Sequence, residues 1–352
     1  MNASSPSRRR LLHAAAGTGL MALGAAARAE PADFTPAERH PAATLHALDP
    51  AFAALFRPGA TVERLATGFR WAEGPAWFDA DAADGGHLLF SDVATNRMLR
   101  HDAATGRTTV FRAPSGNSNG LARDRDGRLL ACEHLGGRVT RTERDGSVTV
   151  LADRFDGQPL NSPNDLVCAR DGAVWFTDPP YGLVDARRAG LVRAEQPHGV
   201  YRLDVARGRL DRVIADLSFP NGLAFARDER RLYVVARKDA GCVLLAFEVD
   251  SEARVGSRSV LFETATGTLD GLRVDTGGNL WCAWGAGANP GHGLAPNGEG
   301  VIVLDARGRL LGQIALPERC ANLCFGGVAR DRLFMTATTS LYALDVAAQG
   351  LG

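Results

Sequence analysis

The sequence predicts an all-β fold, a six-bladed β-propeller formed by one domain from about residue 61 to 348. Three observations lead to this prediction. One short pattern occurs six times at intervals of 45 to 57 residues, each copy reads as four short strands, and helical periodicity is almost absent. A β-sandwich is the alternative for a chain of many short strands, but it does not explain six copies.

Each copy of the pattern begins with a polar residue, usually followed by Gly or Asp, ahead of an apolar strand. An Asp-Gly turn such as Asp171-Gly172 then leads into the next strand. The spacing fits the four strands and turns of one propeller blade. The six starts are Glu73-Gly74, Asn119-Gly120, Asn164-Asp165, Asn221-Gly222, Asp270-Gly271 and Asn322-Leu323.

The ring of blades is expected to close through its N-terminal strand. An outer-strand candidate precedes every copy, and the first of them, residues 61–67, has no blade of its own. It should complete the last blade, whose sequence ends after Leu341-Tyr342-Ala343-Leu344, because this removes two exposed sheet edges. Residues 30–60 form a leader, with one short helix expected near 50–56.

The first 29 residues match an export signal of the twin-arginine type. Arg8-Arg9-Arg10 is followed by an apolar run from 14 to 27 and by the small-residue cleavage pattern Ala27-Arg28-Ala29. The apolar run is shorter than the roughly 20 residues of a membrane-spanning helix. We therefore expect a periplasmic protein that begins near Glu30 and is not inserted in a membrane.

The net charge bears on possible partners, and the cysteine spacing bears on possible disulfides. The whole chain has 40 basic and 40 acidic residues; the export segment holds four Arg and no acid, so 36 basic residues face 40 acidic ones afterwards, a balance of about −4. Nucleic acid is not an expected partner at this charge. None of the six cysteines forms a C-x-x-C pair, and a Cys320–Cys324 bridge is the one pairing that the spacing suggests.

The repeat also predicts a metal site. If the copies are equivalent, their six polar side chains face the central channel at one end. Two carboxylates and four amides, with no His or Cys, suit a hard divalent cation. The alternative is that these residues only begin strands through local turn hydrogen bonds, but a Glu-Asn-Asn-Asp set in register favours the cation. The set is Glu73, Asn119, Asn164, Asn221, Asp270 and Asn322.

The motifs, in order, resemble a known family. They are W-A-E-G-P-A-W, N-S-P-N-D-L-V, T-D-P-P-Y-G, P-N-G-L-A-F and D-G-L-R-V-D, with the tail N-L-C-F-G-G and T-A-T-T-S-L-Y. Together they resemble the family of gluconolactonase, senescence marker protein and regucalcin, in particular its bacterial gluconolactonase branch. The resemblance implies a six-bladed propeller that hydrolyses lactones with one divalent cation, Ca²⁺ first and Zn²⁺ or Mn²⁺ as alternatives.

The resemblance also implies residue roles. The metal ligands would be Glu73, Asn164, Asn221 and Asp270, with Asp270 as the candidate general base, and Asn119 would face a small-molecule substrate. A cation-bound carboxylate is a weaker base, so Asp270 could instead orient or share the proton.

Other residues are open candidates. Asp165 and Asp178 are alternatives for the base and for substrate binding. His134 and His198 are candidate rim or pocket residues, and an ordinary surface position is the alternative for both.

One departure bears on the substrate. Regucalcin-type members carry an Arg two residues before the Asn of the third copy, where this chain has Ser162. A serine cannot supply a guanidinium fork for substrate hydroxyls. The reaction class therefore carries over better than the substrate, for which a sugar lactone such as glucono-1,5-lactone is the first expectation.

Competing interpretations remain. Gly116-Asn117-Ser118-Asn119-Gly120 matches G-x-S-x-G, the serine-hydrolase elbow, but a loop precedes it and a strand follows it, where the elbow needs a strand and then a helix. A noncatalytic ligand-binding propeller with structural calcium is the second functional class. A related propeller esterase or phosphotriesterase is the third. The carboxylates that the first and fifth copies aim at the channel favour the enzyme.

Overall fold

The computed structural model describes residues 34, 38–40, 45–79, 85–191, 193–286, 293–294 and 298–351. The segment expected to direct export, residues 1–29, lies outside these ranges, so export stays a prediction. Within them, the helices are at most six residues long, too short to cross a bilayer.

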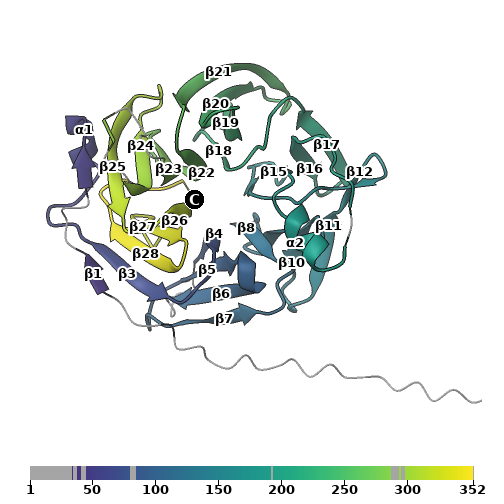
Figure 1. Ribbon diagram of the computed structural model, residues 1–352, viewed down its shortest axis with the longest axis horizontal. Helices are drawn as coiled ribbons and strands as arrows, with labels where there is room; N and C mark the ends of the chain where they lie inside the picture. Colours follow the sequence, from purple (N-terminus) through teal and green to yellow (C-terminus); the bar gives the residue numbers. More distant parts are fainter. Residues whose placement is uncertain are drawn as a thin grey trace, which may run out of the picture.

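Six antiparallel sheets surround a central channel, as Figure 1 shows, which confirms the six-bladed propeller. In each blade, strands that are consecutive in sequence pair with one another, from the innermost strand outward. The first three blades are β4 (Ala72–Phe78), β5 (His87–Asp92), β6 (Arg97–Asp102) and β7 (Thr108–Arg112); β8 (Ser118–Arg123), β9 (Leu129–Glu133), β10 (Arg138–Thr142) and β11 (Val148–Ala152); and β14 (Leu166–Cys168), β15 (Val174–Thr177), β16 (Val200–Asp204) and β17 (Arg209–Ile214).

The other three blades follow the same order. They are β18 (Leu223–Phe225), β19 (Arg231–Arg237), β20 (Cys242–Val249) and β21 (Val255–Thr264); β22 (Thr268–Val274), β23 (Leu280–Gly285), β24 (Glu299–Leu304) and β25 (Leu310–Leu316); and β26 (Cys320–Gly326), β27 (Arg332–Ala337) and β28 (Ser340–Asp345), completed by β3 (Val62–Thr67).

The N-terminal strand closes the ring as the sequence predicts. β3 pairs antiparallel with β28, with Ala66 opposite Leu341 and Arg64 opposite Tyr342. The last blade thus takes its outer strand from the start of the propeller, and the ring has no free end at this joint.

The leader before the propeller contains the predicted short helix and two strands that the sequence does not predict. Its short helix is present as α1 (Pro50–Ala53), which begins where the Asp49 carboxylate accepts the Ala51 N–H at 2.8 Å. In addition, β1 (Glu38–His40) pairs with β3, and β2 (Leu45–Ala47) pairs with β25. Blades five and six therefore have five strands each.

Segments between strands depart from the regular blade. A second helix, α2 (Leu183–Arg188), lies in the long connection between β15 and β16, where no helical pattern is predicted. Six residues are too few to show a 3.6-residue period in the sequence. A 3₁₀ turn, η2 (Val93–Thr95), follows β5, and a small hairpin of β12 (Arg154–Phe155) and β13 (Gln158–Pro159) precedes blade three.

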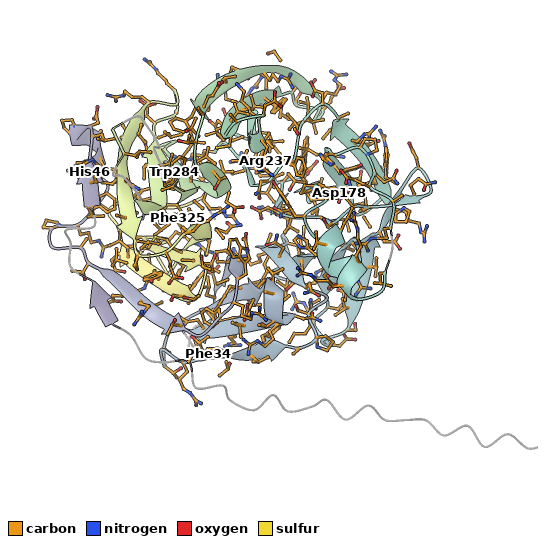
Figure 2. The ribbon with its side chains drawn as sticks, viewed as in Figure 1. Phe34, His46, Asp178, Arg237, Trp284 and Phe325 are labelled. Atoms are coloured by element: carbon orange, nitrogen blue, oxygen red, sulfur yellow. The ribbon has the colours of Figure 1, made fainter. Side chains whose placement is uncertain are left out.

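The core lies between neighbouring blades, where side chains fill the space between sheets (Figure 2). Aromatic pairs cross three of these interfaces: Trp77 with Phe334, Trp175 with Phe225, and Trp281 with Phe325, with ring centres 5.3 to 5.5 Å apart. All six cysteines are free thiols, so the Cys320–Cys324 bridge does not form.

One buried histidine gives the fold a pH-dependent contribution. His101 of β6 is buried, and Nδ1 lies 3.0 Å from Thr108 Oγ1. Burial, with a smaller contribution from the Arg332 charge, lowers the pKa of His101 to about 4. As the pH falls below about 6.5, the unfolded chain is protonated at this residue before the folded protein, so stability is lost between about pH 6.5 and 4.

We expect the variant His101→Gln to lose part of this pH dependence. The difference in free energy of unfolding between pH 7.5 and pH 5.0 should be about 2 kcal/mol smaller in His101→Gln than in the wild type. Urea unfolding at the two pH values measures it. An equal difference in both proteins would mean that His101 takes up its proton in the folded state as readily as in the unfolded one.

Candidate active site at one mouth of the channel

A cavity of about 400 Å³ lies where the inner strands of the propeller begin. Asn322 of the sixth copy is not among the residues that line it, but predicted site residues from the other five blades are, so the repeat brings these together. They are Glu73, Asn119, His134, Asn164, Asn221 and Asp270. A second cavity, of about 640 Å³, is lined by residues nearer the ends of these strands, such as Trp77 and Phe225, and by none of the predicted site residues.

Local irregularities in the inner strands place the polar residues. The pairing register shifts next to Glu73 in β4, next to Asn119 in β8, next to Asp270 in β22 and next to Asn322 in β26. Such bulges leave a residue outside the regular ladder and re-aim its side chain. In these four copies the polar start thus lies at an irregularity of the inner strand, whereas Asn164 and Asn221 precede β14 and β18.

Where the residue after the polar one is glycine, there is no room for a side chain at this position. A Cβ on Gly222 would lie 2.3 Å from the Asp270 carbonyl oxygen, and one on Gly120 would lie 2.6 Å from that of Asn164. Neighbouring inner strands approach each other closely here, as they do where strands converge on a narrow channel.

Two carboxylates face this cavity. Burial raises the pKa of Glu73 well above its usual value, and the charge of Asp270 raises it further. Burial also raises the pKa of Asp270 to about 6, although Arg319 opposes the shift: its Nη2 donates to Asp270 Oδ2 at 3.0 Å. The two acids therefore form a buried, like-charged pair with one guanidinium partner.

Asn119 and His134 form a second polar pair. Asn119 Nδ2 lies 3.1 Å from His134 Nε2. Burial, helped by the Arg193 charge, lowers the pKa of His134 to about 4, so the ring is neutral at pH 7 and can accept the amide hydrogen. This arrangement leaves Asn119 Oδ1 buried without a hydrogen-bond partner in the described part of the chain.

Asp165 lies below the cavity and does not line it. Its Oδ1 accepts the Leu166 N–H at 2.9 Å, and its Oδ2 lies 3.4 Å from Asn322 Nδ2 and 3.5 Å from Arg273 Nη1. Arg273 lines the second cavity, so Asp165 lies in the channel between the two mouths. The structure therefore does not bring its carboxylate to the position of a substrate ligand.

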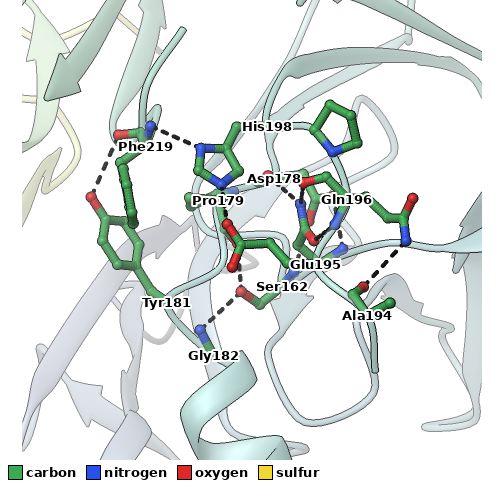
Figure 3. Close-up of polar contacts among 12 residues, drawn as sticks. Ser162, Asp178, Pro179, Tyr181, Gly182, Ala194, Glu195, Gln196, His198 and Phe219 are labelled. Carbon is green, nitrogen blue, oxygen red and sulfur yellow. Dashed lines mark hydrogen bonds and ion pairs between the residues drawn. The ribbon is translucent and has the colours of Figure 1, made fainter. Parts of the chain in front are cut away.

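Asp178 is held away from the cavity. Its two carboxylate oxygens accept the N–H groups of Asn161 and Ser162, each at 2.8 Å. Burial raises the pKa of Asp178 to about 7, although these hydrogen bonds oppose the shift. Figure 3 shows Asp178 and Ser162 among the contacts that fix the long connection after β15. The structure thus gives Asp178 a role in holding this connection.

Two other predictions have clear outcomes. Ser118 is buried within β8, and its Oγ lies 2.8 Å from Ser91 Oγ; the strand continues after it, so no nucleophile elbow forms. His198 lies outside the cavity lining and contacts Phe219: its Nδ1 accepts the Phe219 N–H at 3.2 Å.

Several residues that line the cavity were missed as site residues, among them Trp71, Tyr181, Arg237 and Arg319. Trp71 and Tyr181 occur in the quoted motifs W-A-E-G-P and T-D-P-P-Y-G, which could have signalled them. Arg237 and Arg319 come from the end of β19 and from the turn before β26, and neither position repeats from blade to blade. Periodicity could not find them.

The residues present fit a divalent cation. Two carboxylates and two or three amides around one small cavity form an all-oxygen donor set of the kind that Ca²⁺ prefers. A cation would offset both the burial and the repulsion by Asp270 that raise the pKa of Glu73. The lining offers a softer ion only His134 and the Cys242 thiol, and burial raises the pKa of Cys242 to about 11, which disfavours the thiolate that such an ion needs.

The fold and this cavity define the class of protein: a six-bladed propeller with an acidic, amide-rich site at one mouth of its channel. The family model "SMP-30/Gluconolactonase/LRE-like region" matches residues 71–339, and the chain belongs to this family.

Relatives and solved structures agree with this assignment. A gluconolactonase of Zymomonas mobilis is 33% identical over 301 residues, 79% of each chain, and the pentonolactonase XacC of Haloferax volcanii is 28% identical over 82% of this chain and 96% of its own. The structure of a gluconolactonase of Xanthomonas campestris has a TM-score of 0.76 and 35% identity, over 90% of this chain and 98% of that one. A calcium-binding protein, regucalcin, of Agrobacterium tumefaciens has the same fold, with a TM-score of 0.62 and 21% identity over 82% of this chain and 94% of that one.

Proposed function

We propose that this enzyme hydrolyses a sugar lactone such as glucono-1,5-lactone with one divalent cation, Ca²⁺ first, held by Glu73, Asn164, Asn221 and Asp270. Lactone hydrolysis is the activity that carries over from the relatives, and the chain is a lactonase. The observation that supports the metal is the pair of buried carboxylates that share one cavity with the amides.

The residues of the site suit ring opening by water. A bound divalent cation would supply Lewis acidity toward the lactone carbonyl and toward a water molecule. Arg319 beside Asp270 favours the ionised form of this acid, so its carboxylate can accept a proton from the attacking water and return it to the ring oxygen that leaves.

Asn119 and His134 serve binding in this proposal. The neutral His134 ring holds the Asn119 amide through its Nε2, which leaves Asn119 Oδ1 free to accept a substrate hydroxyl. Trp71 and Tyr181 form apolar and aromatic walls on which a sugar ring can lie.

The experiment is hydrolysis of glucono-1,5-lactone by metal-free protein, followed by addition of Ca²⁺, Zn²⁺ or Mn²⁺, with bound metal measured by calorimetry. We expect activity to fall at least 100-fold after chelation and to return with the preferred ion. Ser118→Ala should retain wild-type activity, because Ser118 lies outside the cavity. Full activity of a protein shown to be free of metal would refute the metal dependence.

The competing functions give different results in the same assay. A propeller esterase would act on p-nitrophenyl acetate faster than on lactones. A ligand-binding propeller with structural calcium would bind the ion and hydrolyse neither. The position of Asp270 within a cavity, beside a guanidinium group, favours the enzyme.

A further inference from the structure

Two arginine side chains reach the cavity in addition to the proposed cation ligands. Arg319 donates to Asp270, and its guanidinium carbon lies 5.5 Å from the centre of the Trp71 ring. Its side chain is 34% exposed, and its Nε is buried without a hydrogen-bond partner within the described ranges. Arg319 therefore has donor capacity beyond its contact with Asp270.

Arg237 is the less constrained of the two. It ends β19 and lines the same cavity, and its guanidinium carbon lies 5.4 Å from the centre of the Phe219 ring. The adjacent Lys238 pairs with Glu263, whereas Arg237 has no acidic partner among the residues that the structure describes. Arg237 thus brings a positive charge to this cavity without an ion-pair partner among these residues.

The aromatic platform under Arg237 is firmly held. Phe219 has a positive φ of 45°, an uncommon conformation for a bulky residue. Its N–H donates to His198 Nδ1, and its carbonyl oxygen accepts the Tyr181 hydroxyl at 3.4 Å, as Figure 3 shows. The Phe219 ring lies 4.8 Å from the His198 ring and 5.6 Å from the Tyr181 ring. The strained backbone conformation of Phe219 thus holds the aromatic ring against which the Arg237 guanidinium packs beside the cavity.

Blade three supplies no cation to the cavity. Ser162, at the position of the regucalcin-type arginine, is fully buried. Its hydroxyl donates to the Pro179 carbonyl oxygen at 2.6 Å and accepts the Gly182 N–H at 2.9 Å (Figure 3). The cationic groups of this cavity come instead from blade four and from the turn before blade six.

The charges that line the cavity indicate which charge a substrate should carry. Its acids are Glu73 and Asp270, and its fixed cations are Arg237 and Arg319. A divalent cation in the proposed site would balance the two carboxylates and leave both guanidinium groups uncompensated. A neutral sugar lactone would bring no charge to meet them.

We propose that Arg237, with Arg319, recognises an anionic group on the substrate, so that the preferred substrate is a sugar lactone with a second acidic group away from its ring carbonyl. This inference rests on the proposed function. The acidic group is a phosphate or a carboxylate, both of which a guanidinium binds through paired hydrogen bonds.

The test compares three lactones: glucono-1,5-lactone, its 6-phosphate, and a glucaric acid lactone that carries a free carboxylate. We expect at least one anionic lactone to have a kcat/KM 10-fold or more above that of glucono-1,5-lactone, mainly through a lower KM. Whichever anionic lactone is preferred identifies the group as phosphate or carboxylate. The preference should shrink as salt is added.

Substitutions at the two ends of β19 test whether Arg237 causes the preference for an anionic lactone. Arg237→Ala should lose at least 10-fold in kcat/KM on the preferred anionic lactone, and Arg237→Lys should retain part of it. Arg231→Ala is the matched control, because Arg231 begins the same strand, β19, and pairs with Glu248 on the surface. It should keep the wild-type preference.

The failures of the two proposals are distinguishable. Hydrolysis of glucono-1,5-lactone with no preference for either anionic lactone overturns the anion site and leaves the lactonase intact. If no lactone is hydrolysed, calorimetry with gluconate, 6-phosphogluconate and glucarate decides: binding of either acid with a second anionic group that is tighter than binding of gluconate, and that Arg237→Ala abolishes, supports the site, and equal binding overturns it.

Discussion

Asp270→Asn should lower kcat/KM for the substrate by about 10³-fold, the loss expected when a positioned proton acceptor is removed. The amide has nearly the shape of the carboxylate, so the cavity keeps its form. It cannot accept a proton, and it has no charge to offer Arg319, whose Nη2 lies 3.0 Å from Asp270 Oδ2. Initial rates on glucono-1,5-lactone, with the uncatalysed rate subtracted, give the measurement.

Asp275→Asn is the matched control for this variant. Asp275 follows the same strand, β22, and its Oδ2 accepts the Trp281 Nε1–H at 2.9 Å, so it serves the packing of blade five. This variant should be less stable but keep kcat/KM within about three-fold. Bound metal measured in both variants separates loss of the base from loss of the cation. Equal activity of Asp270→Asn and the wild type would exclude Asp270 from the chemistry.

Trp281→Ala should lower the free energy of unfolding by about 4 kcal/mol, among the larger effects of a single substitution. Trp281 is fully buried in β23. Its ring lies 5.5 Å from Phe325 in blade six and 5.8 Å from Phe56 in the leader, so its removal opens a cavity where three segments meet. Urea unfolding at 25 °C, followed by far-UV circular dichroism, measures the change.

The control for Trp281→Ala is a hydrophobic residue on the surface. Val260 of β21 is 57% exposed, and Val260→Ala should change the free energy of unfolding by less than about 0.5 kcal/mol. A loss below about 1 kcal/mol in Trp281→Ala would mean that the neighbouring blades collapse into the space left by the indole ring.

The fold and much of the candidate site could be predicted because the propeller converts sequence period into spatial register. Once the copies are aligned, residues such as Glu73 and Asp270 must lie at the same height in the channel, and the structure places both at one cavity. The outer strand at residues 61–67 is likewise predictable. Without its pairing to β28, the last blade would lack an outer strand and residues 61–67 would belong to no blade.

The features that could not be predicted from the sequence occupy positions that do not recur from blade to blade. Arg237 and Arg319 reach the cavity from a strand end and a turn, and Tyr181 comes from an insertion found in one blade. Asp178 follows its strand much as a channel residue could, yet its carboxylate accepts backbone N–H groups, a choice that depends on how the next segment folds back. Strands of three residues, such as β1 and β2, carry too little pattern to be recognised.

The closure of the ring also has a consequence for folding. β3 and β28 pair residues far apart in the sequence, such as Arg64 with Tyr342, and ordering so long an intervening chain is entropically costly. Contacts of this kind are typical of slow folders. During synthesis, β3 emerges first but cannot find its partner until nearly the whole chain has been made. The edge of β3 that faces β28 is thus the last to be paired, and until β28 reaches it this edge is one that a second copy of the chain could occupy.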